Sequence, residues 1–144
     1  YFISSAYPTE SRIISEARKI NNYKAEWCAE KVRRVMLEFE LENHRSPIIA
    51  MMGLAFKPNI DDLRESPAKS ITTNVIQACN NPDIMVVEPN VKENNLFKLT
   101  DYKAAYETAD IVVFLVNHRE FAELNYRKDI IVLDFCGNNM IKIN

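Results

Sequence analysis

The sequence contains very little glycine. Among its 144 residues there are only two, Gly53 and Gly137. A dinucleotide-binding fingerprint requires three glycines in the pattern G-x-G-x-x-G, and a P-loop also requires a glycine-rich turn. The chain therefore carries neither of these two phosphate-binding turns.

Cysteine is also scarce. The three cysteines, Cys28, Cys79 and Cys136, are odd in number, and no two of them have CxxC spacing. This pattern argues against a disulfide framework and against a zinc site, and we expect no bound metal. We expect each cysteine to be a small buried hydrophobic residue in a protein of the reducing cytoplasm.

Charge and hydropathy argue against two classes of partner. The formal net charge is −2, so the surface as a whole does not suggest nucleic-acid binding. No apolar run reaches the roughly 18–20 residues that a membrane span needs, and the first residues do not resemble a signal peptide. The chain begins at Tyr1 without an initiator methionine, and we interpret it as a fragment of a longer protein.

The first third of the sequence predicts one long helix, from about Thr9 to Asn43. Apolar side chains recur there at steps of three and four residues, and Thr9 is the expected N-cap. A helix of roughly 35 residues would span about 50 Å, which is longer than a small domain is wide. We therefore expect one end to pack on something outside this chain. Two helices with a break near Asn21 and Asn22 are the alternative.

Beyond Pro47, short apolar runs alternate with helical segments. The pattern predicts strands at residues 48–55, 84–87, 111–116 and 130–133, and helices at residues 67–79, 101–109 and 118–124. Such alternation is typical of an α/β protein, here a Rossmann-like, three-layer domain with a parallel sheet. Ligands of these sheets bind at the carboxyl ends of the strands.

The segment after the first expected strand is rich in charge. It reads GLAFKPNIDDLRESP, residues 53–67. Lys57 and Arg64 follow the end of a strand, and Ser66 with Pro67 begins a helix whose first N–H groups are free to bind an anion. A phosphate is one such anion, since Arg can bind it bidentately. A loop held by its own Asp–Arg ion pairs explains the same residues equally well.

These fifteen residues resemble the motif that opens the C-terminal domain of the UDP-glucose/GDP-mannose dehydrogenase family. Further matches are EARKINNYK in the long helix, VVEPN after the second strand and TADIVVFLVNHREF around the third, so the resemblance covers essentially the whole chain. It implies that residues 1–46 are a long helix from the central dimerisation domain. Residues 47–144 would then form the C-terminal, Rossmann-like domain that binds a UDP-sugar.

The resemblance also implies an activity. Members of the family oxidise C6 of a nucleotide sugar twice, consume two NAD and use a catalytic cysteine. Those that convert UDP-N-acetylmannosamine to its uronate, for bacterial polysaccharide, resemble the chain most, and UDP-glucose or GDP-mannose are alternative substrates. The cysteine would lie just before Tyr1 and NAD would bind mainly to an absent N-terminal domain, so the chain alone would be inactive. A homodimer through the long helix is also implied.

Site residues follow from the motif positions. The resemblance implies that Phe56 and Lys57 contact the sugar nucleotide, and that Arg64 reaches towards NAD. It also matches Asp61 and Asp62 to the acidic pair of the motif, and we assign them to orienting these cations.

Several points stay open. Cys136 lies where relatives often carry a basic substrate contact, two places after Asp134, and Lys142 lies further on. We expect His118, after the third strand, to be a solvated or capping histidine rather than a proton shuttle. A stand-alone nucleotide-sugar binding module is a different possible function. A receiver-like regulatory domain is another, although it needs an aspartate where the third strand ends in Asn117.

Overall fold

The long helix is continuous in the computed structural model, which describes residues 11–79, 83–92, 95–125 and 127–137. Helix α2 runs Arg12–Asn43, a length of 32 residues, and the alternative of a break at Asn21 and Asn22 is wrong. The run contains no glycine or proline, the two residues that most disfavour a helix interior. Thr9, the expected N-cap, lies outside the described residues.

Four short strands form a parallel sheet in the order β2-β1-β3-β4. Their bounds are Ile49–Met52 for β1, Ile84–Val87 for β2, Ile111–Phe114 for β3 and Ile131–Asp134 for β4. The first strand is shorter than the apolar run that predicted it, because Gly53 has a φ of 94° and turns the chain out of the sheet.

The helices between the strands begin at side-chain caps. Helix α3, Pro67–Ala78, begins after Ser66, whose hydroxyl accepts the N–H of Lys69, as the sequence predicts. Helix α4, Tyr102–Thr108, begins after Asp101, whose carboxylate accepts two backbone N–H groups. The segment predicted as a helix at residues 118–124 is a 3-10 helix, η1, at Arg119–Glu123.

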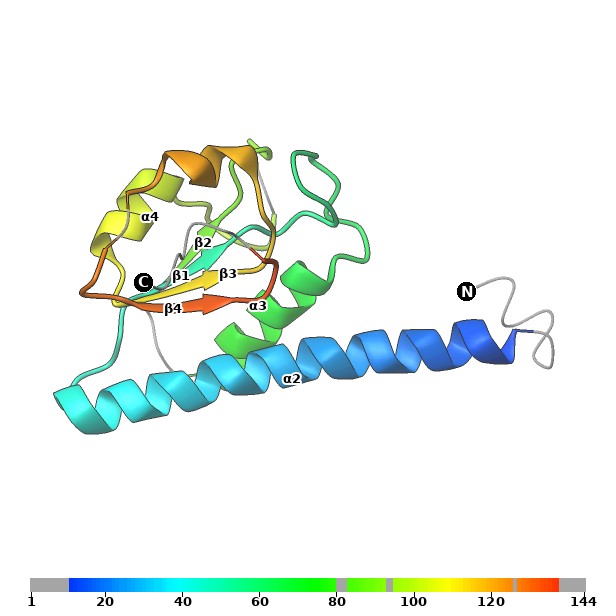
Figure 1. Cartoon of the computed structure of the whole chain (residues 1–144), viewed down its shortest axis with the longest axis horizontal. Helices are drawn as coiled ribbons and strands as arrows, with labels where there is room; N and C mark the ends of the chain where they lie inside the picture. The colour runs from blue at the N-terminus through cyan, green and yellow to red at the C-terminus, as the bar shows by residue number, and fades with distance from the viewer. Residues whose placement is uncertain (1–10, 80–82, 93–94, 126, 138–144) are drawn as a thin grey trace.

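Helices cover both faces of the sheet (Figure 1). On one face, α2 and α3 pack against the side chains of Ile49, Met51 and other alternate strand residues. On the other face, α4 and η1 pack against the neighbouring positions, such as Ala50 and Met52. Successive side chains of a strand point to opposite faces, so each strand contributes to both cores. The predicted three-layer, Rossmann-like fold is confirmed.

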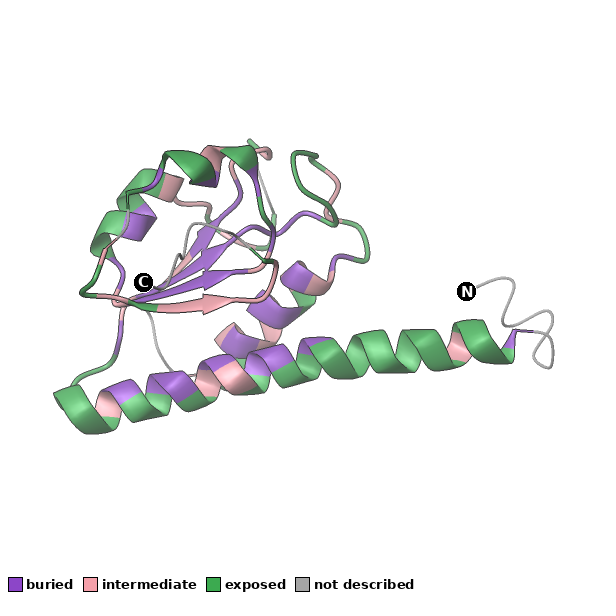
Figure 2. Cartoon of the chain, in the orientation of Figure 1, coloured by how far each residue is buried: buried purple, intermediate pink, exposed green. Residues whose placement is uncertain are grey.

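Only the second half of α2 takes part in this core. Its buried residues lie between Ala25 and Phe39, whereas the first half extends beyond the sheet and is exposed (Figure 2). Ile13 and Ile20 there are 85% and 67% exposed. The division of the chain at residue 46 stays a prediction. Although α2 is long, neither it nor any other helix of the described ranges is apolar enough to cross a membrane.

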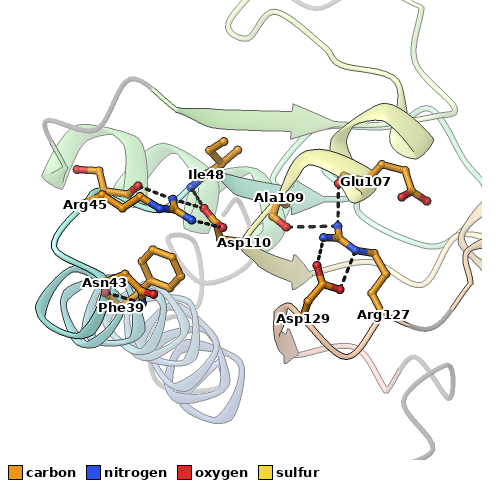
Figure 3. Close-up of polar contacts among 10 residues, drawn as sticks. Phe39, Asn43, Arg45, Ile48, Glu107, Ala109, Asp110, Arg127 and Asp129 are labelled. Atoms are coloured by element: carbon orange, nitrogen blue, oxygen red, sulfur yellow. Dashed lines mark hydrogen bonds and ion pairs between the residues drawn. The ribbon is translucent and has the colours of Figure 1, made fainter.

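Two arginines secure the connections at the amino ends of the strands (Figure 3). Arg45, just after α2, donates two hydrogen bonds of 2.7 and 2.6 Å to the carboxylate of Asp110. The same carboxylate accepts the N–H of Ile48 at 2.8 Å, so it fixes the joint between α2 and β1. Arg127 pairs with Asp129 and donates to backbone carbonyls at the end of α4.

Asp110→Ala should lower the free energy of unfolding by about 1–3 kcal/mol, because the N–H of Ile48 loses its acceptor and the ion pair is broken. The hydrogen bonds from Arg45 hold the pKa of Asp110 below its ordinary value of 3.8. The stabilisation is therefore complete above that value and disappears as the pH falls through the lower pKa of the folded protein. Urea denaturation of both proteins, from neutral to acidic pH, measures the difference.

The matched control is Glu38→Ala, which breaks an exposed pair with Arg34 on α2. It should cost less than about 0.5 kcal/mol. A loss as large as that of Asp110→Ala would contradict a special role for the joint at Asp110.

Candidate functional site

The strand order creates a topological switch point between β1 and β3. From β1 the chain crosses to β2 on one side, while β3 and β4 lie on the other side. In open α/β sheets, ligands bind outside the carboxyl ends of the strands at such a point. The loop that leaves β1 there contains Phe56 and Lys57, and the loop that leaves β3 contains His118.

A buried carboxylate anchors the loop after β1. Glu88 directly follows β2 and is only 3% exposed. Its Oε2 atom accepts the N–H groups of Leu54 and Ala55 at 2.8 and 2.9 Å, and its Oε1 atom accepts the N–H of Asn90 at 3.0 Å. One side chain thereby fixes the backbone of two loops.

His118 joins the third loop to this group. The side chain is completely buried, and its Nε2 atom lies 3.0 Å from Oε2 of Glu88. On the other edge of the ring, Nδ1 accepts the N–H of Asn59 at 3.0 Å and lies 2.9 Å from the side-chain amide nitrogen of Asn90. The expectation of a solvated histidine is wrong. The residue precedes η1, but its side chain does not cap that helix.

Glu88 is ionised despite its burial. Burial is the largest single influence on the pKa of Glu88 and favours the neutral acid. Hydrogen bonds from His118, from the backbone of Leu54 and from the backbone of Asn90 together outweigh it and lower the pKa below its ordinary value of 4.5. The carboxylate is therefore charged at neutral pH, and its charge is balanced by donors from all three loops.

Gly53 allows the loops after β1 and β3 to approach each other. Its φ of 94° is disfavoured for residues with a side chain, and an added Cβ atom would lie 2.7 Å from Cβ of Val116. The N–H of Gly53 still donates to the carbonyl of Val87 at 2.8 Å. The first of the two glycines in the sequence is thus required at the start of the candidate site.

Phe56 and Lys57 lie together on the exposed part of the loop after β1. The Phe56 side chain is 49% exposed, and Nζ of Lys57 lies 5.9 Å from the centre of its ring. The backbone N–H of Phe56 donates to the carbonyl of Asp62 at 2.8 Å, which closes the loop. Within the part of the chain that the structure describes, Lys57 forms no ion pair. An aromatic ring and a free cation are therefore presented side by side.

Arg64 differs from Lys57 because a carboxylate binds it. Its Nε and Nη2 atoms donate to the two oxygens of Asp62 at 2.9 and 2.8 Å, and these hydrogen bonds lower the pKa of Asp62 to about 2. The alternative interpretation, in which ion pairs within the loop hold its charged residues, is therefore correct for Arg64 but not for Lys57. Asp61 is exposed. The roles assigned to these residues stay predictions.

The end of β4 is closed by its own turn. The Oδ1 atom of Asp134 accepts the N–H groups of Cys136 and Gly137 at 3.0 and 2.9 Å. Cys136 packs against the core on the α4 side of the sheet, and its thiol lies 3.4 Å from the same Oδ1 atom of Asp134. Lys142 lies outside the described residues.

Glu88, Asn90 and His118 follow the second and third expected strands, and Asn59 lies in the charged loop after the first, but the sequence did not predict that these four residues bind one another. Each of these polar residues follows a strand in a predicted parallel sheet, and carboxyl ends of neighbouring strands meet at one edge. Their common position at the carboxyl ends of the strands was the feature of the sequence that indicated a cluster. The sequence alone did not indicate that the histidine would be buried against the glutamate.

A hollow of about 670 Å³ lies elsewhere, between α2 and the second half of α3. Tyr23, Trp27, Arg33 and Asn74 are among the residues that line it. It is separate from the carboxyl edge of the sheet. In the described ranges, no group of three or more His, Cys, Asp or Glu side chains is placed to hold a metal ion.

Comparison with known proteins identifies the family. Residues 50–137, more than half of the chain, match the model for the UDP-binding domain of the UDP-glucose/GDP-mannose dehydrogenase family. The chain belongs to this family, whose members are dehydrogenases. The receiver-like alternative is therefore wrong.

Two relatives and one solved structure illustrate the relationship. UDP-N-acetyl-D-mannosamine dehydrogenase of Campylobacter jejuni is 38% identical over 94% of this chain and 33% of its own length. NDP-N-acetyl-D-galactosaminuronic acid dehydrogenase of Ralstonia nicotianae is 38% identical over 87% of this chain and 29% of its own length. The UDP-N-acetyl-mannosamine dehydrogenase structure from S. aureus matches 98% of this chain and 37% of its own, with a TM-score of 0.67 and 23% identity. The chain thus spans about a third of the length of these proteins.

Gly53→Ala should destabilise the protein by about 2–4 kcal/mol, because the added methyl group strains the backbone and overlaps Val116. Gly137→Ala is the matched control. Gly137 also has a positive φ, of 72°, but an added Cβ atom would meet nothing within 4 Å, so only the backbone cost of about 1 kcal/mol remains. Thermal unfolding of both variants gives the comparison, and equal losses would show that the approach to Val116 is not a constraint.

Proposed function

We propose that the chain is the substrate-binding part of an NAD-dependent dehydrogenase that oxidises UDP-N-acetylmannosamine to UDP-N-acetylmannosaminuronate in two steps. The family match and the names of the two relatives support this proposal. We assign the reaction to the cytoplasm and to the synthesis of surface polysaccharide.

One observation carries the assignment of the binding site. Lys57 is an exposed cation without an ion pair among the described residues, next to the exposed ring of Phe56, at the switch point of the sheet. A nucleotide diphosphate has the complementary chemistry, since its phosphates are anionic and its base and sugar rings can lie against an aromatic side chain. Lys57 would bind the diphosphate as a point charge, and Phe56 would pack on a ring of the ligand.

The sugar is the least constrained part of the proposal. The two relatives are equally identical to this chain, but their names assign them to different N-acetylated sugars. Both names contain a nucleoside diphosphate and an N-acetylated sugar, and the first specifies UDP. UDP-glucose and GDP-mannose are alternative substrates.

The catalytic cysteine of the proposed enzyme would lie outside this chain. Burial raises the pKa of the thiols of Cys28 and Cys79, whereas a nucleophilic cysteine needs a lowered pKa. Both pack on the α2 and α3 side of the sheet. Neither Cys28 nor Cys79 therefore suits the role of nucleophile.

NAD would also bind mainly outside this chain. The described loops offer no glycine-rich turn for a dinucleotide, so the residues present do not form an NAD site of their own. Arg64 would contribute a single contact, with Asp62 holding its guanidinium in place and Asp61 adding a second acid nearby. A stand-alone nucleotide-sugar binding module would have no contact with NAD. The contact between Arg64 and NAD therefore distinguishes the proposed dehydrogenase from such a module.

Lys57→Ala should raise the dissociation constant of UDP about tenfold, because one charge-assisted contact to phosphate is lost. Isothermal titration of the 144-residue chain with UDP and with UDP-N-acetylmannosamine measures the effect. Lys19→Ala is the control, because Lys19 is an exposed lysine on the first half of α2. The Lys19→Ala variant should bind UDP as tightly as the unchanged chain. Equal affinity of the Lys57 variant would remove Lys57 from the site.

We also propose that the exposed half of α2 packs against a second copy of the chain. Ile13, Ala17 and Ile20 follow one another at steps of four and three residues and line a shallow hollow with Arg12 and Glu16. Side chains at this spacing share one face of a helix. Their exposure in a single chain leaves an apolar stripe that a second helix of the same kind would cover.

Ile20→Glu should convert a dimer into a monomer, because a charge would be buried in the contact between the two helices. Analytical ultracentrifugation over a range of concentrations measures the change in mass. Leu41→Glu is the control at the other end of α2, where Leu41 is 77% exposed, and it should leave the dimer intact. A chain that is monomeric without any substitution, or a dimer that survives Ile20→Glu, would contradict this contact.

A further inference from the structure

The hydrogen bonds around His118 determine which ring nitrogen carries the proton. A backbone N–H can only donate, so the bond from Asn59 requires Nδ1 to accept. The side-chain amide nitrogen of Asn90 also lies 2.9 Å from Nδ1 and shares the single lone pair of that atom with Asn59. At the opposite edge, the carboxylate of Glu88 can only accept, and Nε2 lies 3.0 Å from it. The arrangement is complete when His118 is neutral with its proton on Nε2.

This histidine acts on the loop that carries the candidate binding residues. The loop is held at its start by Glu88, through the N–H groups of Leu54 and Ala55. It is held again at Asn59, which donates its N–H to His118 and accepts the N–H of Arg119 through its side chain at 2.9 Å. Lys57 lies between these two attachments. Its position over the sheet edge therefore depends on both.

The Asn59 attachment works against the intrinsic preference of the backbone. Asn59 has a φ of 62°, a left-handed conformation that asparagine tolerates better than most residues but that is still uncommon. The loop between the two attachments also contains Pro58, which restricts the backbone of the preceding residue, Lys57. A conformation of this kind persists only where the surroundings hold it, and at Asn59 the Nδ1 atom of His118 is the acceptor that does so.

We propose that His118 is a positioning residue for the nucleotide site: its neutral, Nε2-protonated ring holds Asn59 through Nδ1 and so fixes Lys57 for binding to a diphosphate. The inference rests on the proposed function and adds a residue that does not touch the ligand. Glu88 supports it by selecting the protonated nitrogen and by fixing the orientation of the ring.

The first test is spectroscopic and needs no ligand. In the 144-residue chain labelled with ¹⁵N-histidine, long-range ¹⁵N–¹H correlation spectra distinguish a protonated ring nitrogen from an unprotonated one. There are two histidines, His44 and His118, and His44→Asn assigns the two sets of signals. We expect protonated Nε2 and unprotonated Nδ1 for His118 at neutral pH. A charged ring or a proton on Nδ1 would overturn the proposal.

The second test separates the two edges of the ring. An asparagine side chain places its amide oxygen near the position of Nδ1, whereas a glutamine side chain places its amide nitrogen near the position of Nε2. His118→Asn can therefore still accept from Asn59, and His118→Gln can still donate to Glu88. We expect the first variant to bind UDP within about threefold of the unchanged chain and the second at least about tenfold more weakly.

Urea denaturation of both variants shows whether affinity follows stability alone. If His118 only stabilises the fold, the two variants should lose UDP affinity in proportion to their loss of stability. That result would overturn the proposal. His44→Asn, at an exposed histidine after α2, should match the unchanged chain in both measurements. If neither variant folds, hydrogen exchange of the Asn59 amide in the unchanged chain decides the question: exchange as fast as in an exposed loop would overturn the proposal, and strong protection would support it.

Failure of this inference and failure of the proposed function give different results. If the unchanged chain binds no UDP, the proposed function and the positioning role fail together. If it binds UDP, but the ring carries its proton on Nδ1 or the glutamine variant binds as tightly as the asparagine variant, the positioning role alone fails.

Discussion

The burial of the Glu88 carboxylate constrains the whole carboxyl edge of the sheet. A buried charge is strongly unfavourable unless hydrogen-bond donors surround it. Here the donors are the N–H groups of Leu54 and Ala55 after β1, the N–H of Asn90 after β2 and the ring of His118 after β3. Because one carboxylate needs all of them, the three loops cannot take up independent conformations. The exposed residues of the candidate site lie on this common support.

The opposite edge of the sheet connects this support to the long helix. Asp110 holds both Arg45 and the start of β1, and the second half of α2 shares the core with α3 and the sheet. A partner that binds the exposed first half of α2 is thereby attached, through a continuous helix, to the domain that carries Lys57. Dimer contact and substrate site would then belong to one rigid unit in the proposed enzyme.

The sequence was sufficient for most of the fold because the relevant signals are local. Apolar runs alternated with helical segments, and Ser66 with Pro67 marked the beginning of α3 correctly. The strand ends were less predictable, since the first apolar run continued to Ala55 although Gly53 ends the strand earlier. For the site, the charged loop with Lys57 was recognisable from its composition. The bond between Asn59 and His118 joins residues 59 positions apart, and no local pattern encodes such a contact.

The two cations of the loop are in different electrostatic situations, and this difference bears on how a cleft could close. Arg64 is already neutralised by Asp62, so covering it with a second domain would bury a compensated pair. Lys57 has no such partner within the described residues, and covering it alone would desolvate an isolated charge at a high cost in free energy. An anionic diphosphate next to Lys57 removes that cost. Closure of the proposed enzyme over this edge of the sheet would therefore be favourable only after the nucleotide sugar has bound. Lys57 would in this way couple substrate binding to the exclusion of water from the site.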